Sequence, residues 1–87
     1  MYAVVVRVTL KDEDAATKEL NEQVVPRASQ APGFKAGYWT RKDDNGLSMV
    51  IFETEEQAKA AAEMAKGNVP DAVTLDHVGV REVVASA

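Results

Sequence analysis

The sequence predicts a small α+β domain in which four strands and two helices follow one another in the order β-α-β-β-α-β. Three observations predict it. Strand-like segments with alternating side chains stand near both ends of the chain, an Asn-Gly pair separates two further alternating segments, and two stretches with helical spacing lie between them. At 87 residues the chain has room for one domain, which we expect to span residues 1–87.

The first strand is expected over residues 2–10, because the side chains there alternate between an apolar face and a mixed face. The apolar face consists of Tyr2, Val4, Val6, Val8 and Leu10. Arg7 lies on the mixed face. The residues are largely β-branched, which is typical of a strand in the interior of a sheet.

A first helix is expected between Asp14 and Gln30. Acidic residues at positions 12–14 favour a helix start, and apolar residues then recur every four positions. These apolar residues are Ala16, Leu20, Val24 and Ala28. Pro26 lies inside this pattern, where it removes one backbone donor and clashes with the preceding turn. We therefore expect the helix to bend or restart at Pro26.

The middle of the chain predicts a hairpin with strands over residues 34–42 and 47–53, and a tight turn that contains Asn45-Gly46. With this turn, Trp39 pairs with Phe52 and Arg41 pairs with Val50. A longer loop changes the partners but keeps the faces, because side chains alternate with period two. One face therefore carries Trp39, Arg41, Val50 and Phe52. The other carries Tyr38, Thr40, Met49, Ile51 and Glu53.

The second helix is expected to begin at Thr54, which forms a capping-box pattern with Gln57 three residues later. Its inner face consists of the small residues Ala58, Ala61, Ala62 and Ala65. Gly67 suits the C-terminal cap of this helix. The last strand is expected over residues 73–84.

Two right-handed β-α-β crossovers join these elements into a four-stranded antiparallel sheet with both helices on one face, the ferredoxin-like arrangement. We place Trp39 and Phe52 on the helix side. The opposite face then leaves large apolar residues uncovered on a single subunit, namely Val5, Phe34, Tyr38, Met49 and Ile51. Such a patch is rare on a soluble monomer, so we predict a homodimer in which two sheets pack face to face. Arg7 and Glu53 point into this interface, where a contact between them, within or across subunits, is expected to set the dimer register rather than to serve catalysis.

Composition argues against several classes of function. The net charge of −4 argues against nucleic acid and anionic membrane surfaces as partners. No apolar run approaches the about 18–20 residues that span a bilayer. There is no cysteine, so disulfides and thiolate metal sites are unavailable. Because Met1 leads directly into a strand, the expected location is the cytoplasm.

Four residues are candidates for a ligand site. Trp39 and Phe52 either stack on a flat aromatic ligand or pack in the core. Arg41 either meets an anionic ligand at a pocket mouth or is solvated at a strand end. His77, the single histidine, either acts as a general base or is an ordinary hydrogen-bonded or surface residue. No metal site is predicted, because no set of converging ligands is present.

Several segments together resemble the antibiotic biosynthesis monooxygenase-like family of dimeric α/β-barrel proteins, over nearly the whole chain. The resemblance is carried by residues 2–8 (YAVVVRV), 31–34 (APGF), 37–39 (GYW), 49–53 (MVIFE) and 54–58 (TEEQA). It implies a homodimer with a ligand pocket between the helices and the sheet of each subunit. By the same resemblance, Phe52 occupies the place where several enzymes of the family carry a tryptophan.

Enzymes of this family include cofactor-free oxygenases of aromatic substrates and haem-degrading enzymes. The haem-degrading members use a strand asparagine and a histidine on the second helix. Here the matching strand holds Val4, Val6 and Val8, and the second helix contains no histidine, so no cofactor is predicted.

Two hypotheses on function follow. The first is a cofactor-independent monooxygenase that oxidises a small aromatic substrate bound at Trp39 and Phe52, with His77 or a bound water removing a proton. The second is a non-catalytic module that binds a small apolar ligand or serves dimerisation.

Overall fold

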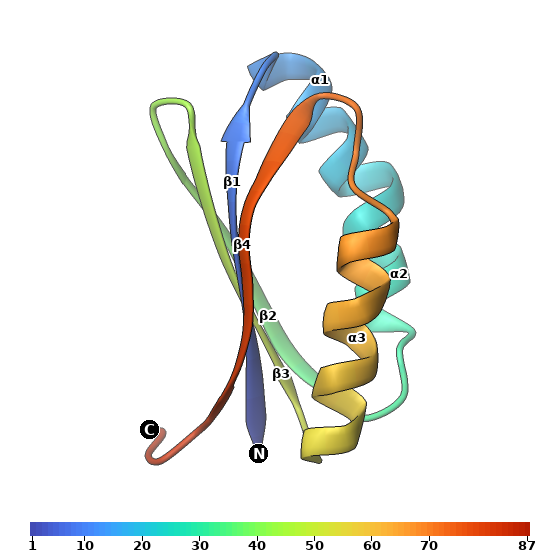
Figure 1. Cartoon of the computed structure of the whole chain (residues 1–87), viewed down its shortest axis with the longest axis vertical. Coiled ribbons are helices and arrows are strands. Elements are labelled where there is room, and N and C mark those ends of the chain that lie inside the picture. The colour runs from blue at the N-terminus through green and yellow to red at the C-terminus, as the bar shows by residue number, and fades with distance from the viewer.

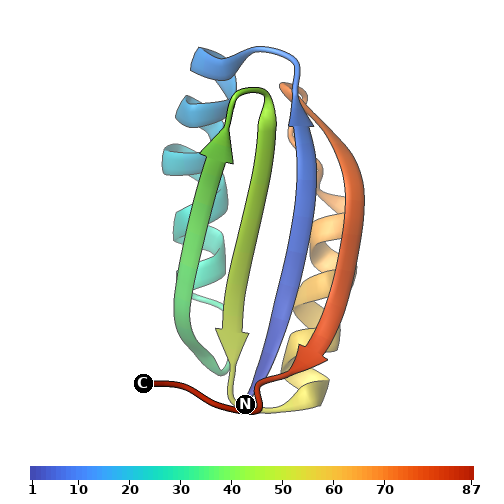
Figure 2. The same ribbon diagram turned by 90° about the vertical axis from the view of Figure 1, so that its left-hand side faces the viewer.

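A four-stranded antiparallel sheet forms one layer of the structure, and the helices cover one of its faces (Figure 1). The computed structural model describes all residues 1–87. The elements in chain order are β1 (Tyr2–Leu10), α1 (Glu13–Glu19), the π-helical turn η1 (Leu20–Val24), α2 (Val25–Ser29), β2 (Phe34–Lys42), β3 (Asn45–Phe52), α3 (Glu55–Gly67) and β4 (Val73–Glu82). The strand order β2-β3-β1-β4 confirms the ferredoxin-like prediction, and Figure 2 shows the open face of the sheet.

The register of the β2–β3 hairpin differs from the predicted one, although Trp39 and Phe52 lie on the expected face. The loop consists of Asp43 and Asp44, because Lys42 pairs with Asn45. Trp39 therefore pairs with Ser48, and the expected partnership of Trp39 with Phe52 is wrong. The expected pairing of Arg41 with Val50 is wrong for the same reason, since Arg41 pairs with Gly46. Each of these partners moves by an even number of residues, so Trp39 and Arg41 keep their expected face.

Close packing explains why Gly46 belongs to a strand and not to the turn. Gly46 pairs with Val8 of the neighbouring β1, and a Cβ atom on Gly46 would lie 2.7 Å from Cγ2 of Val8. Only glycine allows the two strands to meet there. The turn instead uses Asp43, whose φ of 55° is a left-handed conformation that aspartate tolerates.

Phe34 lies on the helix side of the sheet, so its expected place on the open face is wrong. The register between β2 and β3 shifts between Phe34 and Ala36, which turns Phe34 to the other side. The Phe34 ring packs edge to face on Phe52, with centroids 6.4 Å apart and an interplanar angle of 80°.

The first helical segment is interrupted just before Pro26, as expected, and the interruption is a π-helical turn. The N–H group of Val25 donates to the carbonyl oxygen of Leu20, five residues earlier. Helix α2 then starts with Pro26 in its first turn, where the missing N–H group has no intrahelical partner to lose. Asp12 caps the start of α1 by accepting a hydrogen bond from the N–H group of Ala15.

Helix α3 has the predicted capping box. The N–H group of Gln57 donates to Oγ1 of Thr54 at 3.2 Å, and the N–H group of Thr54 donates to Oε1 of Gln57 at 3.1 Å. None of the helices combines the length and the apolar composition that crossing a bilayer requires.

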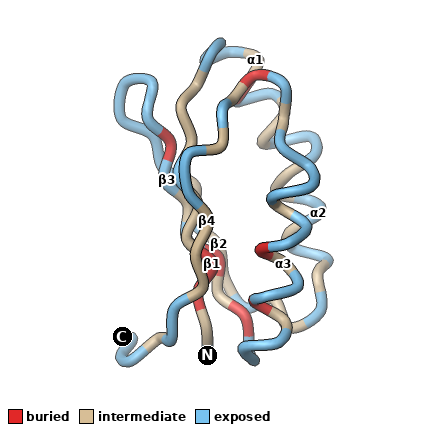
Figure 3. The backbone as a smooth tube through the Cα atoms, in the orientation of Figure 1, coloured by how far each residue is buried: buried red, intermediate tan, exposed pale blue.

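The packed core occupies one end of the space between the layers (Figure 3). Its buried members are Val4, Val50, Phe52, Ala58 and Ala62. Val6 and Val8 continue the same face of β1 toward the other end, but they are only half-buried. The helices therefore cover the second half of the sheet without filling the space beneath them.

Candidate functional site

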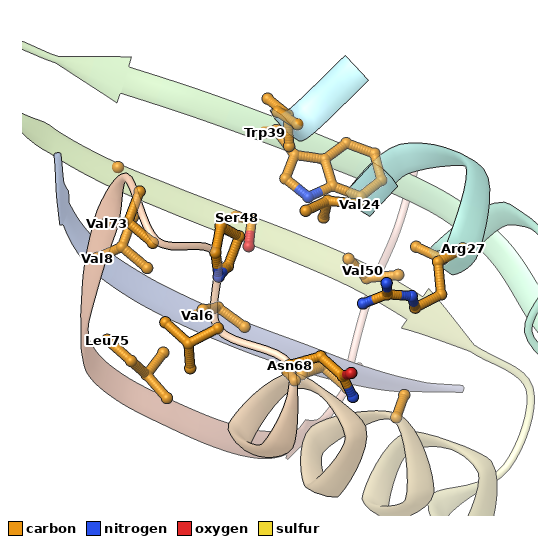
Figure 4. A pocket seen from close by; sticks show the side chains of 18 of the residues that line it. Val6, Val8, Val24, Arg27, Trp39, Ser48, Val50, Asn68, Val73 and Leu75 are labelled. Carbon is orange, nitrogen blue, oxygen red and sulfur yellow. The ribbon is translucent and has the colours of Figure 1, made fainter. Parts of the chain in front are cut away.

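A cavity of about 490 Å³ lies between the sheet and the helices, beside the packed core. Its volume is within the range of about 300–1,000 Å³ that is usual for small-molecule sites. Nineteen of its 29 lining residues are hydrophobic. Val6, Val8 and Leu75 belong to its sheet wall, and Val24 of η1 lies on the helical side (Figure 4).

Small side chains explain why this space stays open. The helical side of the cavity includes the alanines Ala16, Ala28, Ala61 and Ala65. Opposite them, β1 contributes mainly valines. Short side chains on both layers leave a gap in the middle of the cavity, and longer side chains such as Leu10, Met64 and Leu75 line it without filling it. The sequence left two alternatives open for Trp39, packing in the core or bordering a pocket, and the structure has a cavity beside its ring.

Trp39 and Phe52 both line the cavity, but they differ in burial. Phe52 is 1% exposed and belongs to the core, so almost none of its ring is available to a ligand. Trp39 is half-buried and its indole ring faces the cavity (Figure 4). A Cβ atom on Gly37 would lie 2.6 Å from Cη2 of Trp39, so the absence of a side chain at Gly37 gives the ring its place.

Two polar groups next to each other in the cavity have no partner within the chain. Trp39 and Ser48 are paired across the β2–β3 ladder and both line the cavity. Neither the indole N–H nor the Ser48 hydroxyl takes part in a hydrogen bond, and neither is sealed away from solvent. They offer a donor and a hydroxyl to a bound molecule.

Three further polar residues stand at the edge of the cavity. Arg41 lines it and forms a salt bridge with Glu13 of α1, with Nη1 and Oε2 3.4 Å apart. Arg27 extends from α2 toward the cavity, and Asn68 lies across from it after the end of α3 (Figure 4). The Nδ2 group of Asn68 donates to the carbonyl oxygen of Met64 at 2.8 Å, which anchors the amide there.

His77 is not part of this site. It pairs with Arg7 in the β1–β4 ladder and does not line the cavity, whereas Leu75 and Val78 of the same strand face the helix side. A bulge between Leu75 and His77 produces this reversal. The structure thus brings Trp39, Phe52 and Arg41 together but leaves His77 on the open face.

Three cavity residues were not predicted from the sequence, namely Arg27, Ser48 and Asn68. A signal existed for two of them. Arg27 follows Val24 by three residues, which places it beside the apolar stripe of the helix. Ser48 precedes Val50 by two residues and therefore shares its face. Asn68 lies in a loop, where no periodicity applies.

The cavity contains no side chain that ordinarily acts as a general acid or base. The two arginines, Arg27 and Arg41, are its only ionisable lining residues. The Tyr2 phenol, near the start of β1 and outside the cavity, has a pKa that is clearly shifted from its ordinary value. The carboxylates of Glu55 and Glu82 raise the pKa of the Tyr2 phenol, and its hydroxyl donates weakly to Glu82 at 3.5 Å. No group of three or more histidine, cysteine or acidic residues is arranged to hold a metal ion.

The open face of the sheet carries a row of exposed apolar side chains. Tyr38 pairs with Met49, and Met49 pairs with Val5 on the next strand. Tyr38 is 66% exposed and Met49 is 45% exposed. The residues predicted for a dimer interface, Arg7, Tyr38, Met49, Ile51 and Glu53, lie on this face or at its end.

Arg7 and Glu53 do not pair within the chain. Glu53 forms a salt bridge with Lys35 at 3.6 Å, and Arg7 has no acidic partner. The contact that was predicted between Arg7 and Glu53 therefore does not form within the chain.

No family model and no curated protein matches the chain in sequence. Among solved structures, a dimeric ferredoxin-like protein from an uncultured marine organism is similar with a TM-score of 0.67 and 12% identity, over 100% of this chain and 98% of that one. The haem-degrader MhuD from Mycobacterium tuberculosis, solved with two haems in its active site, is similar with a TM-score of 0.54 and 20% identity, over 97% and 98%. Both likenesses support the ferredoxin-like fold.

The cavity of this chain does not fit haem ligation. Haem iron in proteins is held by histidine, cysteine, tyrosine or methionine. No histidine, cysteine or tyrosine lines the cavity, and Met64 is the single residue of these types that does. Methionine usually serves beside a histidine ligand.

Proposed function

We propose that this chain is a dimeric α/β-barrel protein of the antibiotic biosynthesis monooxygenase-like type, which binds a small apolar or aromatic molecule in the cavity of each subunit. One observation carries the proposal: a cavity of about 490 Å³ with mostly apolar walls opens directly beside the core. A ligand there would bury its own apolar surface and would supply the packing contacts that the cavity walls lack.

The polar groups of the cavity support binding with a defined orientation. A small-molecule site typically combines apolar walls with few, well-placed polar groups. Here the Trp39 indole N–H and the Ser48 hydroxyl lie on the sheet side, while Arg27 and Asn68 lie at the edge. A ligand with a flat ring could contact the face of Trp39 and accept a hydrogen bond beside it.

Assembly as a homodimer is supported by the open face of the sheet. Tyr38, Met49 and Ile51 form its apolar part, and in the single chain Tyr38 and Met49 are exposed while Ile51 is half-buried. A second copy would bury this face by packing sheet against sheet. The similar protein from a marine organism is described as dimeric.

Oxidation of the bound molecule is the second candidate function, and the two cavity arginines favour it. A guanidinium group stabilises the deprotonated form of an acidic aromatic substrate, which donates electrons to O₂ more readily than the neutral form. One oxygen atom would convert a ring CH₂ group to a carbonyl and the other would leave as water, so no external reductant is needed. Because His77 lies on the other face, a bound water would have to take the proton.

Binding ranks first because the cavity contains apolar walls and donors but no acid or base. Isothermal titration with 2-naphthamide, a neutral flat probe, tests it. We expect one probe to bind per subunit, with a change in the fluorescence of Trp39. Ala65→Phe fills the cavity from α3 and should abolish both signals. An absence of binding to the wild type, or unchanged binding to a folded Ala65→Phe variant, would reject the proposal.

Oxygen consumption by the same samples tests the second candidate. An acidic aromatic compound with an activated CH₂ group should be consumed together with one equivalent of O₂. Binding without oxygen uptake across such compounds would leave the protein as a binding module.

A further inference from the structure

We infer that the molecule bound in the cavity is an apolar acid with a single carboxylate head group, and that Arg27 and Asn68 bind this head at the cavity mouth. The inference rests on the proposed ligand-binding function and specifies the chemical class of the ligand.

The charges around the cavity are the first support. The chain carries a net charge of −4, with 14 acidic residues and 10 basic ones. Yet no acidic residue and no lysine lines the cavity, while two arginines do. A site for a neutral apolar molecule needs no charge, and a site for a cation would not be lined by arginine. The local charge therefore favours an anion.

The two arginines differ in whether an acidic side chain neutralises them. Arg41 is paired with Glu13 at 3.4 Å. Arg27 forms no salt bridge and no side-chain hydrogen bond. Glu19 and Asp71 line a shallow polar depression next to Arg27, but neither is within salt-bridge distance of it. The guanidinium group of Arg27 is therefore free to bind a ligand.

The location of Arg27 and Asn68 fits a head group. Both residues line the apolar cavity and also the shallow polar depression outside it. They therefore mark the boundary between the apolar interior and the solvent-exposed surface. An apolar body inside the cavity would leave its carboxylate at this boundary, where the charge keeps part of its hydration.

The donors at this boundary suit a carboxylate. A guanidinium group presents parallel N–H donors that match the two oxygens of a carboxylate. The Asn68 amide has two N–H donors, of which the carbonyl oxygen of Met64 occupies one. The second remains for the ligand, and Asn68 lies across the mouth from Arg27 (Figure 4).

A matched pair of probes tests the inference. 2-Naphthoate and 2-naphthamide have the same ring system and nearly the same shape, but only the first carries a charge. We expect the full-length wild-type protein to bind naphthoate about tenfold more tightly than naphthamide, which corresponds to about 1.4 kcal/mol. In Arg27→Gln this preference should disappear, while naphthamide affinity stays the same. Lys18→Gln, which removes one positive charge from α1 away from the cavity, should keep the preference.

Each outcome decides a separate question. If naphthamide binds and naphthoate binds no more tightly, the carboxylate inference is wrong although the proposed function stands. The inference is also wrong if Arg27→Gln and Lys18→Gln lower naphthoate affinity equally, because a general charge effect then explains the preference. If neither probe binds, the proposed function and the inference are both rejected. Arg27→Lys adds a check of geometry, since it keeps the charge but loses the two parallel donors and should retain only part of the preference.

Discussion

Trp39 and Ser48 face the same cavity from paired positions on β2 and β3, and neither side chain has a hydrogen-bond partner in the chain. The two residues lie where the packed core ends and the cavity begins. Val50, two residues along the same face of β3, is buried in the core, whereas Ser48 is only half-buried. Truncation of a side chain beside the cavity should therefore lower the stability of the protein less than truncation of one in the core.

Removal of the Trp39 side chain should destabilise the protein by clearly less than the about 3–5 kcal/mol typical of a buried aromatic ring. The reason is that Trp39 is half-buried and borders a space that is already open. Chemical denaturation of Trp39→Ala, followed by circular dichroism, gives the value. The variant should also lose every ligand-dependent fluorescence signal, because it lacks the single tryptophan.

Phe52→Ala is the matched control for this measurement. Phe52 is 1% exposed and packs on Phe34, so its truncation should have the full cost of about 3–5 kcal/mol. Equal losses for Trp39→Ala and Phe52→Ala would mean that the ring of Trp39 is packed as tightly as the core, and the ligand site beside it would be ruled out.

Gly46→Ala should destabilise the protein by about 1–3 kcal/mol, the usual cost of an overpacked position. The new Cβ atom would meet Cγ2 of Val8 at 2.7 Å and push β3 away from β1. Gly67→Ala is the matched control, because nothing lies within 4 Å of a Cβ atom there. Gly67 ends α3, so alanine should be neutral or slightly stabilising. A harmless Gly46→Ala would contradict the observed strand register.

The fold was predictable from the sequence because each of its determinants is local. Alternation set the faces of β1 and of the hairpin, and the Thr54–Gln57 capping box set the start of α3. The hairpin register was not predictable, because Gly46 could form part of the turn or could lie in β3 where the strand approaches its neighbour closely. Its role depends on Val8, which is distant in sequence and adjacent only after the sheet has formed.

The site was only partly predictable. Trp39, Phe52 and Arg41 followed from alternation along the hairpin. Phe34 was expected on the open face and His77 was a candidate for the site, and both expectations were wrong. Each strand contains an irregularity that reverses the alternation of side chains beyond it. A bulge leaves no clear mark in a single sequence. The size of the cavity depends on how closely the helices approach the sheet, which no single residue determines.

The phenol of Tyr2 should ionise at a higher pH than an ordinary tyrosine, because Glu55 and Glu82 raise its pKa. The neutral form is then favoured by folding. Its contribution to stability is present below the ordinary tyrosine pKa of about 10 and is lost as the pH rises through the higher pKa of the folded state. Carbon-13 NMR of the tyrosine ring carbons, recorded against pH, resolves Tyr2 from Tyr38. In Glu55→Gln the pKa of Tyr2 should fall; no change would show that Glu55 does not act on it.

The open face of the sheet predicts a dimer that buries more than the about 1,600 Å² of a standard interface. Ile51 lies on this face, paired with Ala3 of the central strand β1, and Met49 is its neighbour on the same side. A charged group at Ile51 would lose its hydration beside the apolar side chains of this interface, at a cost that dimer formation would have to offset. Ile51→Lys should therefore dissociate the dimer into monomers in which the open face of the sheet is exposed to water.

Sedimentation at micromolar concentration measures this effect, with the wild type expected at twice the mass of the Ile51→Lys variant. Ala60→Lys adds the same charge at an exposed position of α3, on the helical layer opposite the open face of the sheet, and it should remain dimeric. Circular dichroism of each variant separates dissociation from unfolding, which is a real risk for a subunit with so small a core. A wild-type protein that sediments as a monomer would refute the dimer, since the apolar row of Tyr38, Met49 and Val5 would then be stable in water without a partner.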